Sequence, residues 1–373
     1  MNFPPDHQIA LVQDWLTGMR GGEKVLEVLC ELFPNAPIFT LLHTKGSVSP
    51  VIESHPIHTS FIQYLPLKQT KYRSYLPLFP RAIESFDFSD YKLIISTSHA
   101  VAKGAIPPKG AMHICYCHTP MRYVWDQYDE YFGKGRAGLV TRTAMRFVAP
   151  RLRAWDVRTS DRVHTFIANS RNVAARIQSF YNRSSEVLHA PVDTSAFKLS
   201  TENDGSFLVV SALVPYKRVD LAIQASQKLG LRLNIVGTGP DENKLRSLSG
   251  PDVKFLGWQS DSDLARFYGK CKAVLFPGVE DFGIVPLEAM ASGKPVIAFG
   301  RGGALETIID GTTGVFFGEQ TVGSLIDAIR RIDQVKLELH AIRRHAEGFD
   351  RALFRTRLQS LIARLAEAYK PAF

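Results

Sequence analysis

Short apolar runs alternate along the chain with stretches whose apolar residues recur at helical spacing. Such runs predict buried strands when they end at glycine, proline or polar loop residues. They cover residues 9–12, 93–96, 113–117, 166–168, 207–210, 233–236, 273–276 and 296–299. Helical stripes lie between and after them, including one that Pro34 ends and two at 322–332 and 353–369. Strands that alternate with helices in this way predict an α/β fold built on parallel sheets.

The stretch from Glu280 to Glu306 contains two loop-to-helix junctions, each after a predicted strand. Helical spacing begins at Val285 and stops at Gly293. In open α/β sheets, anionic ligands bind where strand carboxyl ends face helix amino ends. The N–H groups that would be free at the first junction belong to Phe282, Gly283, Ile284 and Val285, and the helix dipole adds partial positive charge there.

Two acids, Glu280 and Glu288, bracket this predicted anion site. A carboxylate repels a phosphate, so we expect both side chains to bind hydroxyl groups instead. This combination suits a sugar that is attached to a nucleoside diphosphate. The alternative is a loop acid that caps the helix, with a solvated glutamate one turn further on.

The same segment resembles the E-x7-E signature of retaining family 4 glycosyltransferases. The matching positions are Glu280, Phe282, Gly283, Pro286, Glu288, Ala289, Gly293, Pro295 and Val296, followed by the G-G-x-x-E turn at 302–306. In that family the first glutamate binds the donor sugar, the second binds the ribose, and the amides after F-G bind the diphosphate. The resemblance implies the GT-B fold, in which two Rossmann-like parallel-sheet domains face each other across a cleft that holds the donor.

The resemblance also implies how the chain divides into domains. We expect an N-terminal, acceptor-binding Rossmann-like domain over residues 1–190, because A-N-S at 168–170 resembles the last strand unit of the family's first domain. A nucleotide-sugar-binding Rossmann-like domain would follow over 191–352. A C-terminal helix within 353–373 would cross back and pack on the first domain.

Two features of the first domain are expected to reach the donor. Gly21 and Gly22 lie between the first strand and its helix, where glycines let a phosphate approach the backbone closely. The resemblance assigns them to the donor diphosphate, and a loop with a mobile glycine pair is the alternative. His118 opens an H-T-P motif where the family has a histidine that hydrogen-bonds the donor sugar near the reaction centre, although a lone histidine is more often structural.

A C-x-C-H run at residues 115–118 raises the question of a metal site. We expect Cys115 and Cys117 to point to opposite faces of their strand, and no second cysteine pair lies at zinc spacing. An Asp-x-Asp metal motif is not needed for a diphosphate leaving group in this family. The sequence therefore predicts no metal, and no cofactor beyond the nucleotide-sugar substrate.

The loop after residue 210 resembles the family sequence G-R-L-x-x-x-K-G, whose arginine and lysine bind the donor phosphates. Lys217 stands at the lysine position, Ala212 replaces the arginine, and Arg218 replaces the last glycine. Whether Arg218 supplies the missing cation is left open, and a solvated lysine is the alternative for Lys217. Trp258 lies in a segment similar to the one that passes the nucleobase in the family.

Charge and composition narrow the choice of partner and compartment. The 373 residues carry a formal net charge of +9, which favours a polyanionic partner. Zinc-finger spacing and RNA-recognition signatures are absent, so no nucleic acid is expected. Four scattered cysteines indicate no disulfide framework, and the first residues lack a secretion-signal pattern, so we expect a cytoplasmic protein.

The basic segment 134–162 interleaves arginines with apolar residues, which is typical of a helix at an anionic membrane surface. A solvated helix whose apolar side packs on its own domain explains the pattern equally well. On the first interpretation the protein would bind peripherally at the inner face of the cytoplasmic membrane.

Together these features predict a retaining glycosyltransferase with Glu280, His118 and Lys217 as catalytic residues. The opening D-W-L-T-G-M-R-G-G-E-K-V is most similar to bacterial mannosyltransferases of O-antigen and exopolysaccharide assembly. That similarity implies transfer of mannose from GDP-mannose to a polyprenyl-diphosphate-linked saccharide during cell-surface polysaccharide synthesis, which includes lipopolysaccharide. The alternatives are a GT-B nucleotide-sugar 2-epimerase and a non-catalytic scaffold that binds nucleotide sugars.

Overall fold

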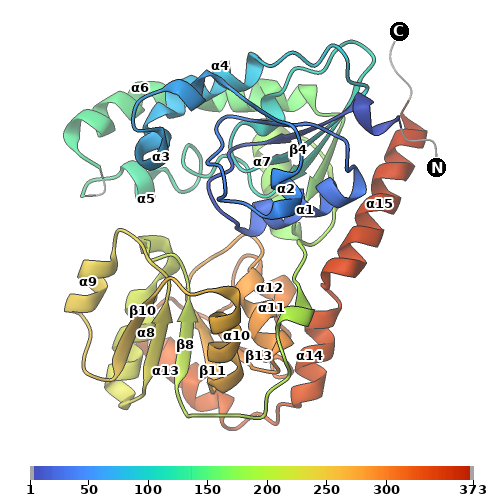
Figure 1. The fold of residues 1–373 in the computed structure, drawn as a ribbon. Helices are drawn as coiled ribbons and strands as arrows, with labels where there is room; N and C mark the ends of the chain where they lie inside the picture. Colours follow the sequence, from blue (N-terminus) through green and yellow to red (C-terminus); the bar gives the residue numbers. More distant parts are fainter. Residues whose placement is uncertain (1–3, 136, 370–373) are drawn as a thin grey trace. The chain divides into compact units, whose positions relative to one another are not determined.

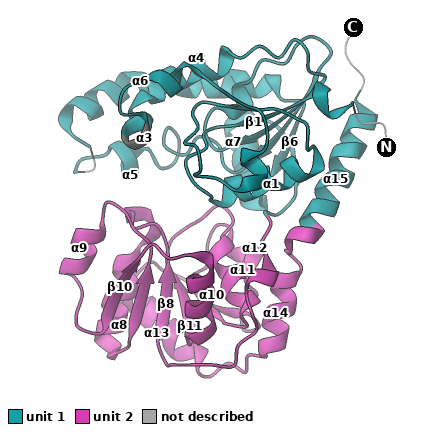
Figure 2. Ribbon diagram, viewed as in Figure 1, with its two compact units in different colours: residues 1–190, 354–373 teal, residues 191–353 magenta. Residues whose placement is uncertain are grey.

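A computed structural model describes residues 4–135 and 137–369 of the chain. Its internal contacts divide it into two compact units, coloured teal and magenta in Figure 2. Unit 1 comprises residues 1–190 and 354–373, and unit 2 comprises residues 191–353. The roles expected for these parts, acceptor binding and nucleotide-sugar binding, stay predictions.

Unit 1 is built on a β-sheet, of which Figure 1 labels strand β4. The sheet has seven strands in the order β3-β2-β1-β4-β5-β6-β7, and every pairing in it is parallel. The central strands are apolar runs that are buried along their whole length, as parallel strands covered on both faces require. The strands are β1 (Ile9–Gln13), β2 (Ile38–Thr40), β3 (Ile57–Thr59), β4 (Leu93–Ser98), β5 (Met112–Cys117), β6 (Thr165–Ala168) and β7 (Ser185–Val187).

The last helix of the chain packs on unit 1. α15 (Arg351–Ala368) buries Phe354, Leu358 and Ile362, which are spaced four residues apart and therefore share one helix face. These side chains join the apolar cluster that contains Val25 of α1 (Gly21–Leu32). The predicted return of the C-terminal helix to the first part of the chain is confirmed. The other helices are α2 (Pro50–Glu53), α3 (Lys68–Lys71), α4 (Phe79–Glu84), α5 (Tyr128–Phe132), α6 (Leu139–Thr159) and α7 (Arg171–Tyr181).

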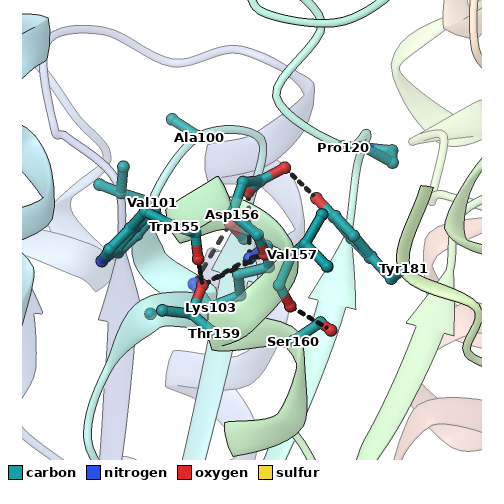
Figure 3. A network of polar contacts seen from close by, with 12 residues as sticks. Ala100, Val101, Lys103, Pro120, Trp155, Asp156, Val157, Thr159, Ser160 and Tyr181 are labelled. Carbon is teal, nitrogen blue, oxygen red and sulfur yellow. Dashed lines mark hydrogen bonds and ion pairs between the residues drawn. The ribbon is translucent and has the colours of Figure 1, made fainter. Parts of the chain in front are cut away.

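A buried polar network ties α6 and α7 to the 3-10 turn η4 (Ala102–Gly104). The Lys103 ammonium lies 3.0 Å from Asp156 Oδ1 and donates to Thr159 Oγ1 at 2.9 Å, as Figure 3 shows. Asp156 Oδ2 accepts hydrogen bonds of 2.8 Å from Tyr181 and from the Trp125 indole. A buried charge is tolerated only when it is paired and hydrogen-bonded, so this network fixes the carboxyl-terminal half of α6 within unit 1.

Unit 2 is built on a six-stranded parallel sheet with the order β10-β9-β8-β11-β12-β13. Its strands are β8 (Phe207–Val210), β9 (Leu233–Val236), β10 (Val253–Gly257), β11 (Ala273–Phe276), β12 (Val296–Phe299) and β13 (Gly314–Phe317). The helices are α8 (Val219–Leu229), α9 (Glu242–Ser247), α10 (Asp261–Lys270), α11 (Ile284–Ala291), α12 (Ala304–Thr307), α13 (Val322–Ile332) and α14 (Leu339–Glu347). The central strands β8 and β11 follow one another in the sheet although β9 and β10 separate them in sequence.

The apolar runs located the inner strands well. The predicted bounds of β8, β9, β11, β12 and α13 agree with the structure, whereas β1 extends one residue further, to Gln13. α11 begins at Ile284 instead of Val285, and α15 begins at Arg351 instead of residue 353. The strands that the sequence did not reveal are short, and most lie at sheet edges, where half-buried polar positions interrupt the apolar pattern.

Candidate functional site

The loop between β11 and α11 ends in a glycine that the backbone requires. Gly283 has φ 93°, in the left-handed region, and a Cβ there would lie 3.4 Å from the Phe276 ring. α11 starts at the next residue, so the first amides of this helix have no intrahelical partner. Pro286 lacks an N–H, which leaves the amides of Ile284 and Val285 as donors in the first turn.

The G-G turn after β12 holds this loop in place. Gly303 donates its N–H to the Glu280 carbonyl at 2.8 Å, and a Cβ at Gly303 would overlap the Phe282 backbone. Phe282 itself is buried, with 3% of its surface exposed. Only glycine therefore allows the second junction to pack directly on the first, which explains why the two motifs occur together.

Glu280 forms an ion pair with Lys217, whose ammonium binds Glu280 Oε1. Lys217 ends the 3-10 turn η7 (Pro215–Lys217) after β8, and Glu280 follows β11. Because β8 and β11 are neighbouring parallel strands, their carboxyl ends lie at the same edge of the sheet. The lysine offsets the negative charge of the acid, so an anionic ligand at the α11 amino end meets less repulsion. Lys217 is not the solvated lysine of the alternative interpretation, since its side chain is only 12% exposed.

Glu288, one turn into α11, is buried and not solvated, so this part of the alternative interpretation is wrong. Its residue exposure is 7%, and Tyr268 of α10 donates its hydroxyl proton to Glu288 Oε2 at 3.0 Å. Burial, followed by the charge of Glu288, raises the pKa of Tyr268 well above its usual value of 10.0, so the phenol stays a donor. Tyr268 was not predicted from the sequence, because an aromatic residue on an amphipathic helix has the pattern of an ordinary core residue.

Arg218 and Trp258, which were also predicted to bind the donor, have no contact with Glu280 or Glu288 among the interactions described above. Arg218 adopts a left-handed backbone with φ 51°, and its Nε and Nη2 each lie 3.1 Å from the Asp220 carboxylate. Trp258 follows edge strand β10 and is 77% exposed, and β9 and β8 separate that strand from β11 in the sheet order. A donor-binding role for either residue stays a prediction.

In unit 1, Gly21 and Gly22 form the first turn of α1, and His118 directly follows β5. A Cβ at Gly22 would lie 3.5 Å from His118 Nε2, so the structure brings these predicted residues together. The Tyr116 ring packs against the His118 imidazole, with ring centroids 5.2 Å apart. The glycine pair is thus part of a helix, which corrects the alternative of a mobile loop.

Asp14, at the end of β1, organises this edge of unit 1 and was not singled out from the sequence. Its carboxylate accepts hydrogen bonds from the four successive amides of residues 99–102 and lies 3.0 Å from His99 Nδ1. Burial would raise the pKa of Asp14, but the charge of His99 and hydrogen bonds from His99 and Ala102 outweigh it and leave the pKa below its usual value.

The sequence predicted that Cys115 and Cys117 point to opposite faces of β5, and this prediction is wrong. Residues two apart on a strand share a face, and Cys115 and Cys117 lie in the same apolar cluster as Phe166. Burial raises the pKa of the Cys115 thiol to about 12. Within residues 4–135 and 137–369, no group of three or more histidine, cysteine, aspartate or glutamate side chains is arranged to hold a metal ion.

Residues 193–347 match the family model described as "Glycosyl transferases group 1". The matched range falls within unit 2 and includes Lys217, Glu280 and Glu288. The part of the chain that carries these residues is therefore similar to group 1 glycosyltransferases.

Curated relatives are similar over part of their length. An uncharacterised glycosyltransferase of Methanocaldococcus jannaschii is 34% identical over 137 residues, which are 35% of this chain and 39% of that protein. The D-inositol 3-phosphate glycosyltransferase of Mycobacterium tuberculosis is 28% identical over 222 residues, which are 51% of this chain and 46% of the relative. The chain thus spans less than half the length of these relatives.

A solved structure resembles nearly the whole chain. Anabaena HepE in complex with UDP and glucose aligns with a TM-score of 0.68 over 95% of this chain and 99% of its own, at 16% identity. At that identity the likeness concerns the fold. Together with the two parallel sheets, it confirms the predicted class, an α/β protein of the GT-B fold.

Proposed function

We propose that this protein is a retaining glycosyltransferase that uses a nucleoside-diphosphate sugar as donor. The observation that carries the proposal is the Lys217–Glu280 ion pair at the amino end of α11, with Glu288 buried one turn further on. An ammonium and free helix amides suit a diphosphate, and two carboxylates suit the hydroxyls of the sugar and the ribose. The match of this unit to a glycosyltransferase family supports the same conclusion.

In this proposal the bond between the anomeric carbon and the diphosphate oxygen breaks, and an acceptor hydroxyl oxygen bonds to that carbon on the same face. The hydroxyl proton passes to an oxygen of the leaving diphosphate. Lys217 and the amides of Ile284 and Val285 stabilise the negative charge that grows on the leaving group, an effect that is strongest when the donors are fixed beforehand. Glu280 holds the hydroxyl groups of the sugar. The catalytic role of His118, in unit 1, stays a prediction.

We further propose GDP-mannose as donor and a polyprenyl-diphosphate-linked saccharide as acceptor, in cell-surface polysaccharide synthesis in the cytoplasm. The opening motif and the net charge of +9 support this choice, since both substrates are anionic. UDP and glucose are ligands of HepE, so UDP-glucose serves as the comparison donor in the experiments.

The experiment is a thermal-shift panel with UDP, GDP, ADP and their sugars, followed by a transfer assay with the donor that stabilises the protein most. The proposal predicts a rise in Tm with GDP-mannose and its loss in the double variant Lys217→Met/Glu280→Gln. Stabilisation by UDP-glucose alone would make UDP-glucose the donor in place of GDP-mannose, and the protein would still be a glycosyltransferase. No stabilisation by any donor, together with no transfer, would refute the class.

We also propose that the α6 region binds an anionic membrane surface. α6 buries Met145, Ala149 and Leu152 but exposes 75% of Leu139, 83% of Val140 and 63% of Phe147. The exposed Arg146 and Arg151 lie on the same helix, and exposed apolar residues beside arginines are typical of membrane-surface helices. Arg136, in the same basic segment, lies outside the described residues. Among the helices of the described chain, none is long and apolar enough to cross a membrane.

Salt-sensitive co-sedimentation with vesicles that contain anionic lipid tests this surface. We expect binding at low ionic strength, weaker binding at about 0.5 M salt, and loss of binding in Leu139→Ser/Phe147→Ser. Leu305→Ser is the matched control, since Leu305 is 58% exposed on unit 2 and outside the basic segment. Equal sedimentation of both variants would contradict the proposed surface.

A further inference from the structure

A buried amide at the end of β1 points to a further ligand-binding residue. Gln13 is the last residue of β1, pairs in register with Thr97 of β4, and is fully buried. The Thr97 hydroxyl donates a hydrogen bond to Gln13 Oε1, which leaves the amide nitrogen as the outward donor. Within the described part of the chain, Gln13 Nε2 has no hydrogen-bond partner. A buried donor without a partner destabilises the fold, so its retention calls for an explanation.

This nitrogen lies beside the first turn of α1. A Cβ built on Gly22 would be 3.5 Å from Gln13 Nε2 and 3.5 Å from His118 Nε2. α1 has 12 residues, and the amides of its first turn have no intrahelical acceptor and lie at the positive end of the helix dipole. Gly21 and Gly22 are partly exposed, so a ligand can reach this point from solvent.

The two nearby acids are already engaged. Asp14 binds four backbone amides and His99. Glu23 accepts a 3.0 Å hydrogen bond from the Arg20 amide, and burial raises the pKa of its carboxyl group above the usual value. Because both acids are already hydrogen-bonded, neither provides a cation site beside Gly22. The polar groups that remain at this position include the hydrogen-bond donors of Gln13 and of the first turn of α1.

We propose that Gln13 Nε2 donates a hydrogen bond to a phosphate oxygen that binds at the amino end of α1, with Thr97 as the positioning residue for the amide. The inference rests on the proposed function, which supplies two diphosphates: that of the nucleotide-sugar donor and that of a polyprenyl-linked acceptor. A phosphate oxygen would give the buried donor the acceptor that the protein itself does not provide.

The test is a calorimetric titration of the full chain with inorganic pyrophosphate at constant ionic strength. Gln13→Met keeps the length of the side chain and removes the donor, and Gln13→Met/Thr97→Val replaces both partners by apolar groups so that no new unpaired hydroxyl remains. Gln178→Met is the matched control, since Gln178 is an exposed glutamine on α7. Gly22→Ala is a second probe, because its methyl group would meet only ordinary contacts within unit 1.

We expect both Gln13 variants and Gly22→Ala to bind pyrophosphate roughly tenfold more weakly or worse, because a hydrogen bond to a charged oxygen is lost or blocked. We also expect the double variant to keep or exceed the wild-type Tm, whereas a purely structural Gln13 would lower it. Wild-type affinity in a double variant that keeps its Tm would overturn the inference, as would a wild-type chain that does not bind pyrophosphate.

The source of the phosphate is read from two further titrations, with GDP and with farnesyl diphosphate. Weakened GDP binding assigns Gln13 to the donor, and weakened farnesyl diphosphate binding assigns it to the acceptor. Pyrophosphate binding that depends on Gln13 in a chain that transfers no sugar would leave this inference standing while the proposed function fails. Sugar transfer by a chain whose pyrophosphate binding does not depend on Gln13 would support the proposed function and refute this inference.

Discussion

Removing the Tyr268 hydroxyl tests the arrangement around Glu288 in unit 2. In Tyr268→Phe the ring remains, including its edge contact with Phe197 at a centroid distance of 5.6 Å, and only the 3.0 Å hydrogen bond to Glu288 is lost. Tyr268 is fully buried and Glu288 is 7% exposed, so water does not replace the phenol as donor. A hydrogen bond to a charged group contributes about 1.5–3 kcal/mol, and burial favours the upper part of that range.

The change should appear in two assays. Tm should fall by between about 3 and 12 °C, because 1 kcal/mol shifts the Tm of a domain of this size by about 2–4 °C. If Glu288 holds the ribose in ground state and transition state alike, the donor KM should rise while kcat stays nearly unchanged. Tyr75→Phe is the control, since its hydroxyl bonds the Pro66 carbonyl at the surface and should matter little.

A double-mutant cycle with Glu288→Met separates the pair from the ring. We expect a coupling energy of about 1.5 kcal/mol or more between the two positions. A coupling energy near zero, or Tyr268→Phe with wild-type Tm and wild-type donor KM, would refute the reasoning.

Three other predictions follow from the structure. Lys103→Met should lower the free energy of unfolding by about 3–5 kcal/mol in denaturant titrations, because it leaves the buried Asp156 carboxylate without its cation; a loss below 1 kcal/mol, about that of an exposed pair, would contradict it. Glu280→Gln should reduce kcat about a hundredfold or more in the transfer assay while the fold is kept, and wild-type turnover would end the assignment. Burial, followed by the charge of His164, lowers the pKa of His113 from 6.5 to about 3. The unfolded chain therefore binds a proton between these values that the folded chain does not, so stability should fall as pH drops from about 6.5 toward 3. A His113→Gln variant should flatten that dependence of Tm on pH, and an unchanged slope would contradict it.

Apolar patterning was enough to predict the parallel sheets, since the inner strands are buried on both faces and read as continuous apolar runs. The motif at 280–306 predicted the α11 junction for a physical reason. A Cβ at Gly303 would overlap the Phe282 backbone, and Gly283 has a left-handed backbone that other residues rarely adopt. Lys217 and Glu280 meet because β8 and β11 are adjacent. The resemblance assigned both residues to the donor, but it did not predict that they pair with each other.

Other features depended on tertiary contacts that no local pattern encodes. Tyr268 looks like any core aromatic until α10 brings it to Glu288. Gln13 and Asp14 end an apolar strand, which is a signal for site residues, but their partners lie more than 80 positions away. The error about Cys115 and Cys117 had a different origin: strand periodicity itself puts both on one face.

The central claim is that unit 2 binds the diphosphate of a nucleotide sugar at the amino end of α11. The most direct test is a crystal structure of the protein soaked with GDP-mannose, with UDP-glucose as the comparison donor. The account predicts diphosphate oxygens within hydrogen-bond distance of Lys217 Nζ and of the Ile284 and Val285 amides, with Glu280 on the sugar hydroxyls. A nucleotide sugar bound elsewhere on the protein, with the Lys217–Glu280 pair unchanged, would contradict it.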